Sequence, residues 1–322
     1  MNETITLIDA YSQIYRGFYA LPLLSNSKGQ FTNAILATAK FLISLDREYY
    51  SPYGAVVFDK GRPEHRMKII PEYKAQRPPM PEELRGQLPQ IRELVEAFGW
   101  RIVEKEGQEA DDIIAAIAVT FKGNQVRIVS ADKDIAQVID DRIKMLIPDR
   151  EKKGAGGYVI QGPDEVLARF AVKPSQIVDY LSLIGDSSDN IPGIDGVGPK
   201  TAAKLITQFG SIDNLLLNVA QIENEKLRAK ISGAAEFLKK NKQIITLDLS
   251  LPDDFLKDVE YFHKRKPDIG KLKAMAEDLD LKSIRTELEK MSGDGNAVPP
   301  PASAAKAARK KNDDMFTPDL FG

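Results

Sequence analysis

The sequence predicts an α/β domain with a mostly parallel sheet, followed by an all-helical domain and a flexible tail. Short β-branched runs alternate with helical patterns up to about residue 162, and the strand signal stops there. From Ser292 the composition shifts to Pro and Ala with a basic run, which is typical of a linker. Alternating strands and helices imply βαβ units and a sheet covered on both faces. We expect domains over 1–162 and 163–291 and a tail over 292–322.

Each expected element rests on apolar spacing. Apolar runs of strand length predict strands over 5–9, 54–59, 101–103 and 126–129. Apolar residues at helical spacing predict helices over 33–50, 81–98 and 111–121 between them. In the second half, helices are expected over 163–170, 175–184, 199–209, 222–245, 267–276 and 281–291.

The composition narrows the classes of function. The 322 residues include no Cys and only two His, which excludes disulfides and thiolate zinc sites and leaves little for a His-based metal site. No apolar run approaches the ~18 residues of a membrane span, and residues 1–9 lack a signal-peptide pattern. We therefore expect a cytoplasmic enzyme or binder, with any metal held by carboxylates.

Three of the expected strands end in a carboxylate. Asp9 and Asp59 close two strands, and Asp132 follows 126–129, with Asp134 two residues on. Ligands bind outside the carboxyl ends of parallel strands, so these acids should converge at one edge of the sheet. Further acids begin the helix after 101–103 or follow the helix over 175–184: Glu109, Asp111, Asp112, Asp186 and Asp189.

A single acid at a strand end is usually a turn former, and acids in a first helical turn usually serve as caps. Nine acids at one place need cations, because like charges so close cannot all stay ionised. Oxygen ligands without His or Cys favour Mg²⁺ or Mn²⁺, and the number suits two or more ions acting on a phosphodiester.

Basic and glycine-rich segments suggest that the substrate is DNA. Residues 60–85 hold seven Lys or Arg against four Glu, and Tyr73 there could stack a base. Arg16 is a further candidate for a phosphate contact. A glycine-rich turn before the helix over 199–209 offers backbone amides to a DNA phosphate. The residues expected to contact the DNA are Gly193, Gly196, Val197, Gly198, Lys200 and Thr201. The alternatives are an ordinary charged loop and a plain helix–helix connection.

Five motifs together resemble the 5′ nuclease domain of bacterial DNA polymerase I, in the flap endonuclease superfamily. They are LIDAYSQIYRGFYAL, VVFDKGRPEHRMKIIPEYKAQRPPMPEEL, EADD, VSADKDIAQVI and GDSSDNIPGIDGVGPKTAAKLI, and the resemblance covers residues 3–290. It implies a Rossmann-like (PIN-like) core with a helical arch over about 60–98. It also implies a helix-three-turn-helix element over about 175–209 that grips duplex DNA and can hold K⁺ on backbone carbonyls.

The resemblance also implies roles for residues. The metal-binding carboxylates of the family match Asp9, Asp59, Glu109, Asp111, Asp112, Asp132, Asp134, Asp186 and Asp189. Its cationic residues match Arg16, Lys74 and Arg77, and its arch tyrosine matches Tyr73. The implied reaction is two-metal hydrolysis of DNA or RNA-primer phosphodiesters near a 5′ end, nick or flap, in Okazaki-fragment processing and repair. The protein is expected to act as a monomer, in the cytoplasm of a bacterial cell and associated with its nucleoid.

The end of the chain suggests one more partner. Asp319, Leu320 and Phe321 resemble peptides that bind the bacterial sliding clamp, although Thr317 stands where such peptides usually have Gln. The tail is expected to tether a stand-alone nuclease to the clamp; the alternative is an end without a partner.

Three other classes of protein share part of this pattern. An aspartate-nucleophile phosphatase would need a second Asp two residues after Asp9, where Tyr11 stands. A PIN-type ribonuclease would not require the GVGPK turn, and a DNA-junction binder without catalysis would not need the carboxylates.

The formal net charge of −2 conceals a basic surface. Removing the nine negative charges assigned to the metal site leaves +7 for the rest of the chain, and the tail contributes as many basic as acidic residues. We therefore expect a basic DNA-binding surface around an acidic centre.

Overall fold

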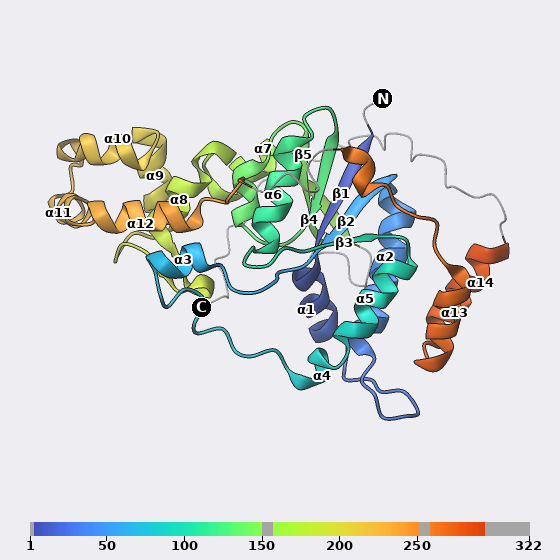
Figure 1. Cartoon of the computed structure of the whole chain (residues 1–322). Helices are drawn as coiled ribbons and strands as arrows, with labels where there is room; N and C mark the ends of the chain where they lie inside the picture. Colours follow the sequence, from blue (N-terminus) through green and yellow to red (C-terminus); the bar gives the residue numbers. More distant parts are fainter. Residues whose placement is uncertain (1–2, 150–156, 251–257, 294–322) are drawn as a thin grey trace, which may run out of the picture.

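A six-stranded sheet forms the centre of one half of the molecule, in the order β3-β2-β1-β4-β5-β6 (Figure 1). The computed structural model describes residues 3–149, 157–250 and 258–293. The strands are β1 (Thr4–Asp9), β2 (Tyr53–Val57), β3 (Arg101–Val103), β4 (Gln125–Val129), β5 (Ile143–Pro148) and β6 (Tyr158–Gln161). The first five pair in parallel and β6 is antiparallel to β5. The mostly parallel sheet is confirmed.

Strands β5 and β6 and helix α1 are among the elements that were not predicted. β5 follows the short 3₁₀ helix η1 (Asp134–Val138) rather than a full helix, so the alternation of strand and helix is interrupted before β5 and β6. Helix α1 (Ala10–Ala20) begins directly after β1, where Asp9 caps it by accepting a hydrogen bond from the Ser12 N–H. Asp9 therefore ends a strand and starts a helix.

Helices cover both faces of the sheet. Those of the α/β half are α1, α2 (Asn33–Tyr49), α3 (Glu64–Ile69), α4 (Glu82–Arg85), α5 (Leu88–Ala97) and α6 (Ala110–Thr120). Ile5 and Leu7 of β1 face a core that includes α6 and the helical half, whereas Ile8 faces a second core with α1, α2 and α5. This alternation is the period of two expected of a strand buried on both sides.

The helix expected over 81–98 is two helices, which is a correction. α4 ends at Arg85, and α5 starts again at Leu88 with Pro89 in its first turn. Pro has no N–H and its ring clashes with the carbonyl four residues earlier, so a continuous helix cannot form. The buried amide of Gln87 at the break accepts hydrogen bonds from the backbone of Ala34 and Ile35 at the start of α2. α5, the last part of the expected arch, packs on the sheet.

The second half is helical, as predicted (Figure 1). Its elements are α7 (Pro163–Phe170), η2 (Pro174–Gln176), α8 (Ile177–Ile184), α9 (Pro199–Phe209), α10 (Ile212–Leu217), η4 (Val219–Gln221), α11 (Glu225–Gly233), α12 (Ala235–Ile245), η6 (Val259–Phe262), α13 (Ile269–Asp278) and α14 (Lys282–Gly293). The helical pattern expected over 222–245 consists of α11 and α12, which join at Ala234. α13 and α14 return to the α/β half, where Leu272 and Leu288 are buried in the core beside α2 and α5.

A small antiparallel hairpin interrupts the predicted connection between α8 and α9. Its strands are β7 (Gly185–Asp186) and β8 (Ile191–Pro192), with the 3₁₀ turn η3 (Ser187–Asp189) between them. Gly185 has φ +75°, and a side chain on it would overlap the backbone of Gly193. Only glycine adopts this conformation without strain, so Gly185 fixes the direction in which Asp186 and Asp189 leave α8.

Candidate functional site

The site lies at β1, where the order of the strands in the sheet reverses. The chain continues from β1 to β2 on one side of β1, whereas β4 pairs with β1 on its other side. This is a topological switch point, where open α/β sheets bind ligands outside the carboxyl ends of their strands. Asp9 ends β1, and its carboxylate accepts hydrogen bonds from the Ser12 N–H (3.1 Å) and the Ser130 hydroxyl (2.9 Å).

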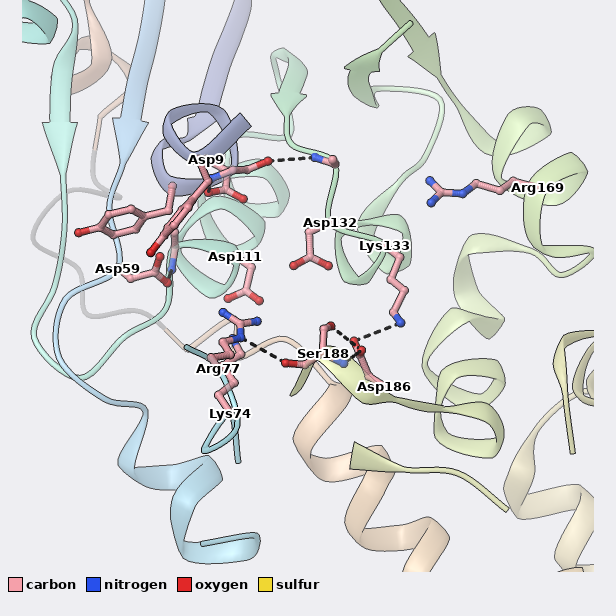
Figure 2. A pocket seen from close by; sticks show the side chains of 15 residues that line it. Asp9, Asp59, Lys74, Arg77, Asp111, Asp132, Lys133, Arg169, Asp186 and Ser188 are labelled. Carbon is pink, nitrogen blue, oxygen red and sulfur yellow. Dashed lines mark hydrogen bonds and ion pairs between the residues drawn. The ribbon is translucent and has the colours of Figure 1, made fainter. Parts of the chain in front are cut away.

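A cavity of about 440 Å³ opens at this point and is lined by five carboxylates. They are Asp9, Asp59, Asp111, Asp132 and Asp186. Asp9, Asp59 and Asp132 come from the ends of three strands, as predicted, and Asp186 comes from the hairpin after α8. Figure 2 shows Asp9, Asp111 and Asp132 around one open space, with Lys74 and Arg77 on one side and Arg169 on another.

The other four predicted carboxylates surround this cavity without lining it. Glu109 lies beside Asp111 and lines an adjoining cavity of about 410 Å³ under residues 61–80. Asp134 and Asp189 form a compact group with Asp186, in which one oxygen of each lies within 4.8 Å of the others. Asp112 is fully buried and bonds Arg66, and one of its oxygens lies within 4.8 Å of one oxygen each of Glu109 and Asp111.

Burial and mutual repulsion raise the proton affinity of this cluster. Burial raises the pKa of Asp9 to about 7, and the charges of Asp59 and Asp132 add to the effect. Burial also raises the pKa values of Asp59, Asp111, Asp132 and Asp134, with contributions from neighbouring carboxylates. The ionised cluster therefore lacks sufficient positive charge around it.

Four cations pair with members of this group: Arg66, Lys74, Arg77 and Lys133. At full ionisation, nine carboxylates exceed these four by five negative charges. In addition, the buried Oδ1 of Asp134 has no hydrogen-bond partner among the described residues. Unpaired oxygen donors in a negatively charged cavity without His or Cys fit hard divalent cations.

Lys74 and Arg77 face the carboxylates, as expected of cations at a phosphate site. The Lys74 ammonium bonds Glu109 and lies 3.6 Å from Asp189, and Arg77 bonds Asp189 at 2.5 Å. Burial alone would lower the pKa of Lys74, but Glu109 and Asp189 outweigh it and hold that pKa above its usual value. The same ion pairs, with Arg66, hold the pKa of Glu109 below its usual value against the effect of burial.

Tyr73 differs from the expectation. Its side chain is 7% exposed, and its hydroxyl lies 3.1 Å from both Glu109 and Asp189. The ring is more buried than expected of a stacking platform, but it lines the adjoining cavity, so stacking on a base stays a prediction. In this arrangement Tyr73 connects the carboxylates of the two halves.

Arg16 also lies apart from the carboxylates. It bonds the Tyr158 hydroxyl at 2.7 Å and lies over that ring, with its guanidinium carbon 5.2 Å from the centroid. Among the described residues, those lining the two cavities do not include Arg16. Its assignment as a phosphate contact stays a prediction without geometric support here.

The glycine-rich turn leads directly into α9, as predicted. Gly198 is the N-cap residue and Pro199 the first helical residue, so the amides of Lys200 and Thr201 lie in the first turn, while Gly196 has φ +80°. Gly193 packs against the Ile184 carbonyl, where no side chain fits. Val197 is buried and anchors the turn by donating its N–H to Ile194.

Sequence reasoning missed several residues of the site. Tyr11 and Tyr15 line both cavities from α1, and Lys133 and Arg169 line the larger one. Arg66 is buried between Glu109 and Asp112. The tyrosines, four apart directly after Asp9, could have been found once a helix was placed there. Nothing in the sequence distinguishes Arg66 from its exposed basic neighbours.

The described ranges contain no helix that is both long and apolar enough to cross a membrane. The expected clamp-binding residues Asp319, Leu320 and Phe321 lie outside the described residues.

Two family models match the chain. Residues 4–171 match "5′-3′ exonuclease, N-terminal resolvase-like domain", and residues 172–269 match "5′-3′ exonuclease, C-terminal SAM fold". A curated "5′-3′ exonuclease" of Aquifex aeolicus is 38% identical over 90% of this chain and 96% of its own length. "DNA polymerase I, thermostable" of Thermus caldophilus is 36% identical over 88% of this chain, which spans 33% of that polymerase.

Solved structures share the fold. The T5 D15 protein co-crystallised with metal ions has a TM-score of 0.60 at 20% identity, covering 90% of this chain and 99% of that one. The catalytic core of Rad2 in complex with a DNA substrate has a TM-score of 0.58 at 17% identity, covering 89% and 92%. The predicted fold class, an α/β core with a helical C-terminal domain, is confirmed.

Proposed function

Because the chain belongs to the 5′-3′ exonuclease family, we propose that it hydrolyses phosphodiester bonds of DNA and primer RNA near 5′ ends, nicks and 5′-flap junctions. The observation that carries the proposal is the cavity at the switch point, where five carboxylates face Lys74 and Arg77. Removal of primers and flaps in replication and repair is the matching biological task.

The carboxylates Asp9, Asp59, Asp111, Asp132 and Asp186 would hold divalent ions in the cavity. Bound ions would supply activation of water and stabilisation of the leaving oxygen. The donor set suits Mg²⁺ and Mn²⁺ equally well, since both prefer oxygen ligands. The relative activity with each ion at equal concentration tests the choice.

Lys74 and Arg77 bind the phosphate in this proposal. Both line the two cavities and are held in place by Glu109 and Asp189. Arg77 is half exposed, so its guanidinium is accessible to a phosphate oxygen at the mouth. Two fixed cations at that position favour the negative charge that develops at phosphorus.

The start of α9 grips the duplex away from the cut. Its first-turn amides and Lys200 bind a backbone phosphate without reading sequence. K⁺ on the carbonyls of residues 193–198 would strengthen this contact, and a higher affinity in K⁺ than in Na⁺ at equal ionic strength tests it.

Three further assignments complete the proposal. The protein acts on DNA in the bacterial cytoplasm, as a monomer, and residues 319–321 tether it to the sliding clamp. Light scattering tests the monomer, and titration of a 312–322 peptide against the purified clamp tests the tether. Absence of peptide binding at high micromolar concentration would end the clamp assignment.

A 5′-flap duplex labelled on the flap strand tests the activity. The wild-type chain should release a 5′-phosphorylated product with Mg²⁺ and none with EDTA. Asp132→Ala should lower the rate by at least about 100-fold, because a carboxylate of the cavity wall is lost. Asp213→Ala is the matched control, since Asp213 is 67% exposed and pairs with Lys242 far from the cavity.

Equal rates for wild type and Asp132→Ala with Mg²⁺ would refute the metal-dependent nuclease. Tight binding of the flap duplex without any cleavage by the wild type would instead support a junction binder.

A further inference from the structure

Arg66 is one of the largest side chains that are fully buried in the described part of the chain, with 2% exposure. Its guanidinium bonds Glu109 and forks onto Asp112, with Nη1 2.6 Å from Oδ2 and Nη2 2.7 Å from Oδ1. Its Nε donates to the Ile244 carbonyl at the end of α12 (2.9 Å). Because the Nε, Nη1 and Nη2 atoms of this planar guanidinium are all hydrogen-bonded, its position and orientation are fixed, which is not so in an exposed salt bridge.

Both carboxylate oxygens of Asp112 accept hydrogen bonds in this arrangement. Its exposure is 0%, and its Oδ1 also accepts a hydrogen bond from the Asp248 N–H at 2.7 Å. The cavity is lined by Asp111, the residue before it. One oxygen of Asp112 lies within 4.8 Å of one oxygen each of Asp111 and Glu109. Both Asp112 oxygens bond Arg66, however, whereas Asp111 lines the cavity.

These contacts join three segments that are distant in sequence. Arg66 lies on α3, Asp112 in the first turn of α6, and Ile244 with Asp248 at the end of α12 and beyond. α3 packs on α12, and Figure 1 shows α3 beside α12. The Arg66 fork is therefore a fixed point at which both halves hold the segment leading to the site.

Backbone hydrogen bonds connect Arg66 to the segment that holds Lys74. The Ile70 N–H donates to the Arg66 carbonyl, the Tyr73 N–H donates to Ile70, and the Lys74 N–H donates to the Asp189 carbonyl (2.9, 3.0 and 3.0 Å). Lys74 has φ +54°, a conformation that a non-glycine residue holds only when its surroundings impose it.

We propose that Arg66 and Asp112 form a buried latch that positions Lys74 over the carboxylates, and that Asp112 serves the site through this latch rather than as a metal ligand. The inference rests on the proposed function for what Lys74 does once in place. The latch itself is a property of folding and contacts, so it can be tested without cleavage.

Direct binding of Mn²⁺ to the full chain, read from the EPR signal of the free ion, tests the role of Asp112. Asp111→Asn should weaken Mn²⁺ binding by about tenfold more than Asp112→Asn does, because the Asp112 oxygens already bond Arg66. Equal weakening by the two substitutions would overturn the proposal, because Asp112 would then act as a ligand.

Hydrogen exchange of the full chain tests the latch with a second variant, Arg66→Lys, which keeps the charge and loses the fork. Exchange should rise in peptides covering 64–77 while β1 and β4 keep their wild-type protection. Lys68→Gln is the matched control on α3, since the Lys68 side chain is 79% exposed, and it should leave exchange unchanged. Uniform loss of protection, or unchanged exchange over 64–77, would overturn the latch.

Cleavage kinetics give a third readout. Arg66→Lys should lower kcat by about 100-fold with little change in KM, because Arg66 is buried and Lys74 is displaced rather than removed. A raised KM with unchanged kcat would overturn the positioning role. If wild type cleaved nothing, the proposed function would fail, while Mn²⁺ binding and exchange would still decide on the latch.

Discussion

The stability of the metal-free protein should depend on the ionisation of Asp9. Asp9 lies in the cavity wall, and burial, with the charges of Asp59 and Asp132, raises its pKa to about 7 from 3.8. Asp9→Asn removes the charge and keeps the shape. The amide oxygen can accept from the Ser12 N–H, and the amide nitrogen can donate to the Ser130 hydroxyl in place of the present contact.

The direction follows from proton binding. Between pH 4 and 7 the folded wild type holds a proton that the unfolded chain has released, so its free energy of unfolding falls as the pH rises. A pKa difference of three units corresponds to about 4 kcal/mol of folding stability. This stabilisation falls by about 1.4 kcal/mol per pH unit as the pH rises to 7, and the stability then stays constant above pH 7. Asn does not titrate, so the advantage of Asp9→Asn should grow by about 3 kcal/mol from pH 5 to 7 and then level off.

Urea unfolding in EDTA, followed by tryptophan fluorescence, measures this advantage. Trp100 is the only tryptophan in the chain, and it is buried in the α/β half, so it reports on the unit that holds Asp9. An advantage that stays constant or shrinks between pH 5 and 8 would refute the reasoning. Asp280→Asn is a control of opposite sign. The Ser27 N–H lowers the pKa of Asp280, so this substitution should destabilise at pH 7 and less as the pH falls.

Three other substitutions test the site and its support. Lys74→Ala should lower kcat by about 100- to 1000-fold with little change in the Kd for flap DNA, measured by single-turnover cleavage and fluorescence anisotropy; equal losses in both would contradict its role. Gly185→Ala should cost more than about 1 kcal/mol in urea unfolding, since φ is +75° and the side chain overlaps Gly193, whereas the open position Gly198→Ala should cost less. Asn241→Leu should cost about 1–3 kcal/mol, because the buried amide donates to two backbone carbonyls; an unchanged urea midpoint would contradict this.

The sequence was sufficient for four of the six strands of the sheet and for the acids at its edge. Asp9, Asp59 and Asp132 follow apolar runs of strand length, and the carboxyl ends of parallel strands meet at one edge whatever the details of packing. Local periodicity did not reveal β5 and β6, because a 3₁₀ turn replaces the helix that would have separated β4 from β5. It also missed the break after Arg85.

The local sequence pattern did not predict the direction in which individual side chains point. Tyr73 reads as an exposed aromatic among cations, yet its hydroxyl is held by carboxylates from both halves of the molecule. Arg66 resembles its exposed neighbours Arg62 and Lys68, and only its contacts with Asp112 distinguish it. Such contacts join residues 36 or more positions apart, which no helical or strand period encodes.

The sequence by itself determined that carboxylates gather at the ends of parallel strands, because strand periodicity and the direction of the sheet are local properties. Only the tertiary structure decided which of them enter the cavity. The phase of α6 places Asp111 in the cavity and turns Asp112 toward Arg66, and the hairpin after Gly185 brings Asp186 across from the helical half. Helix phase and chain direction at a turn depend on packing against distant segments, and that packing exists only in the folded chain.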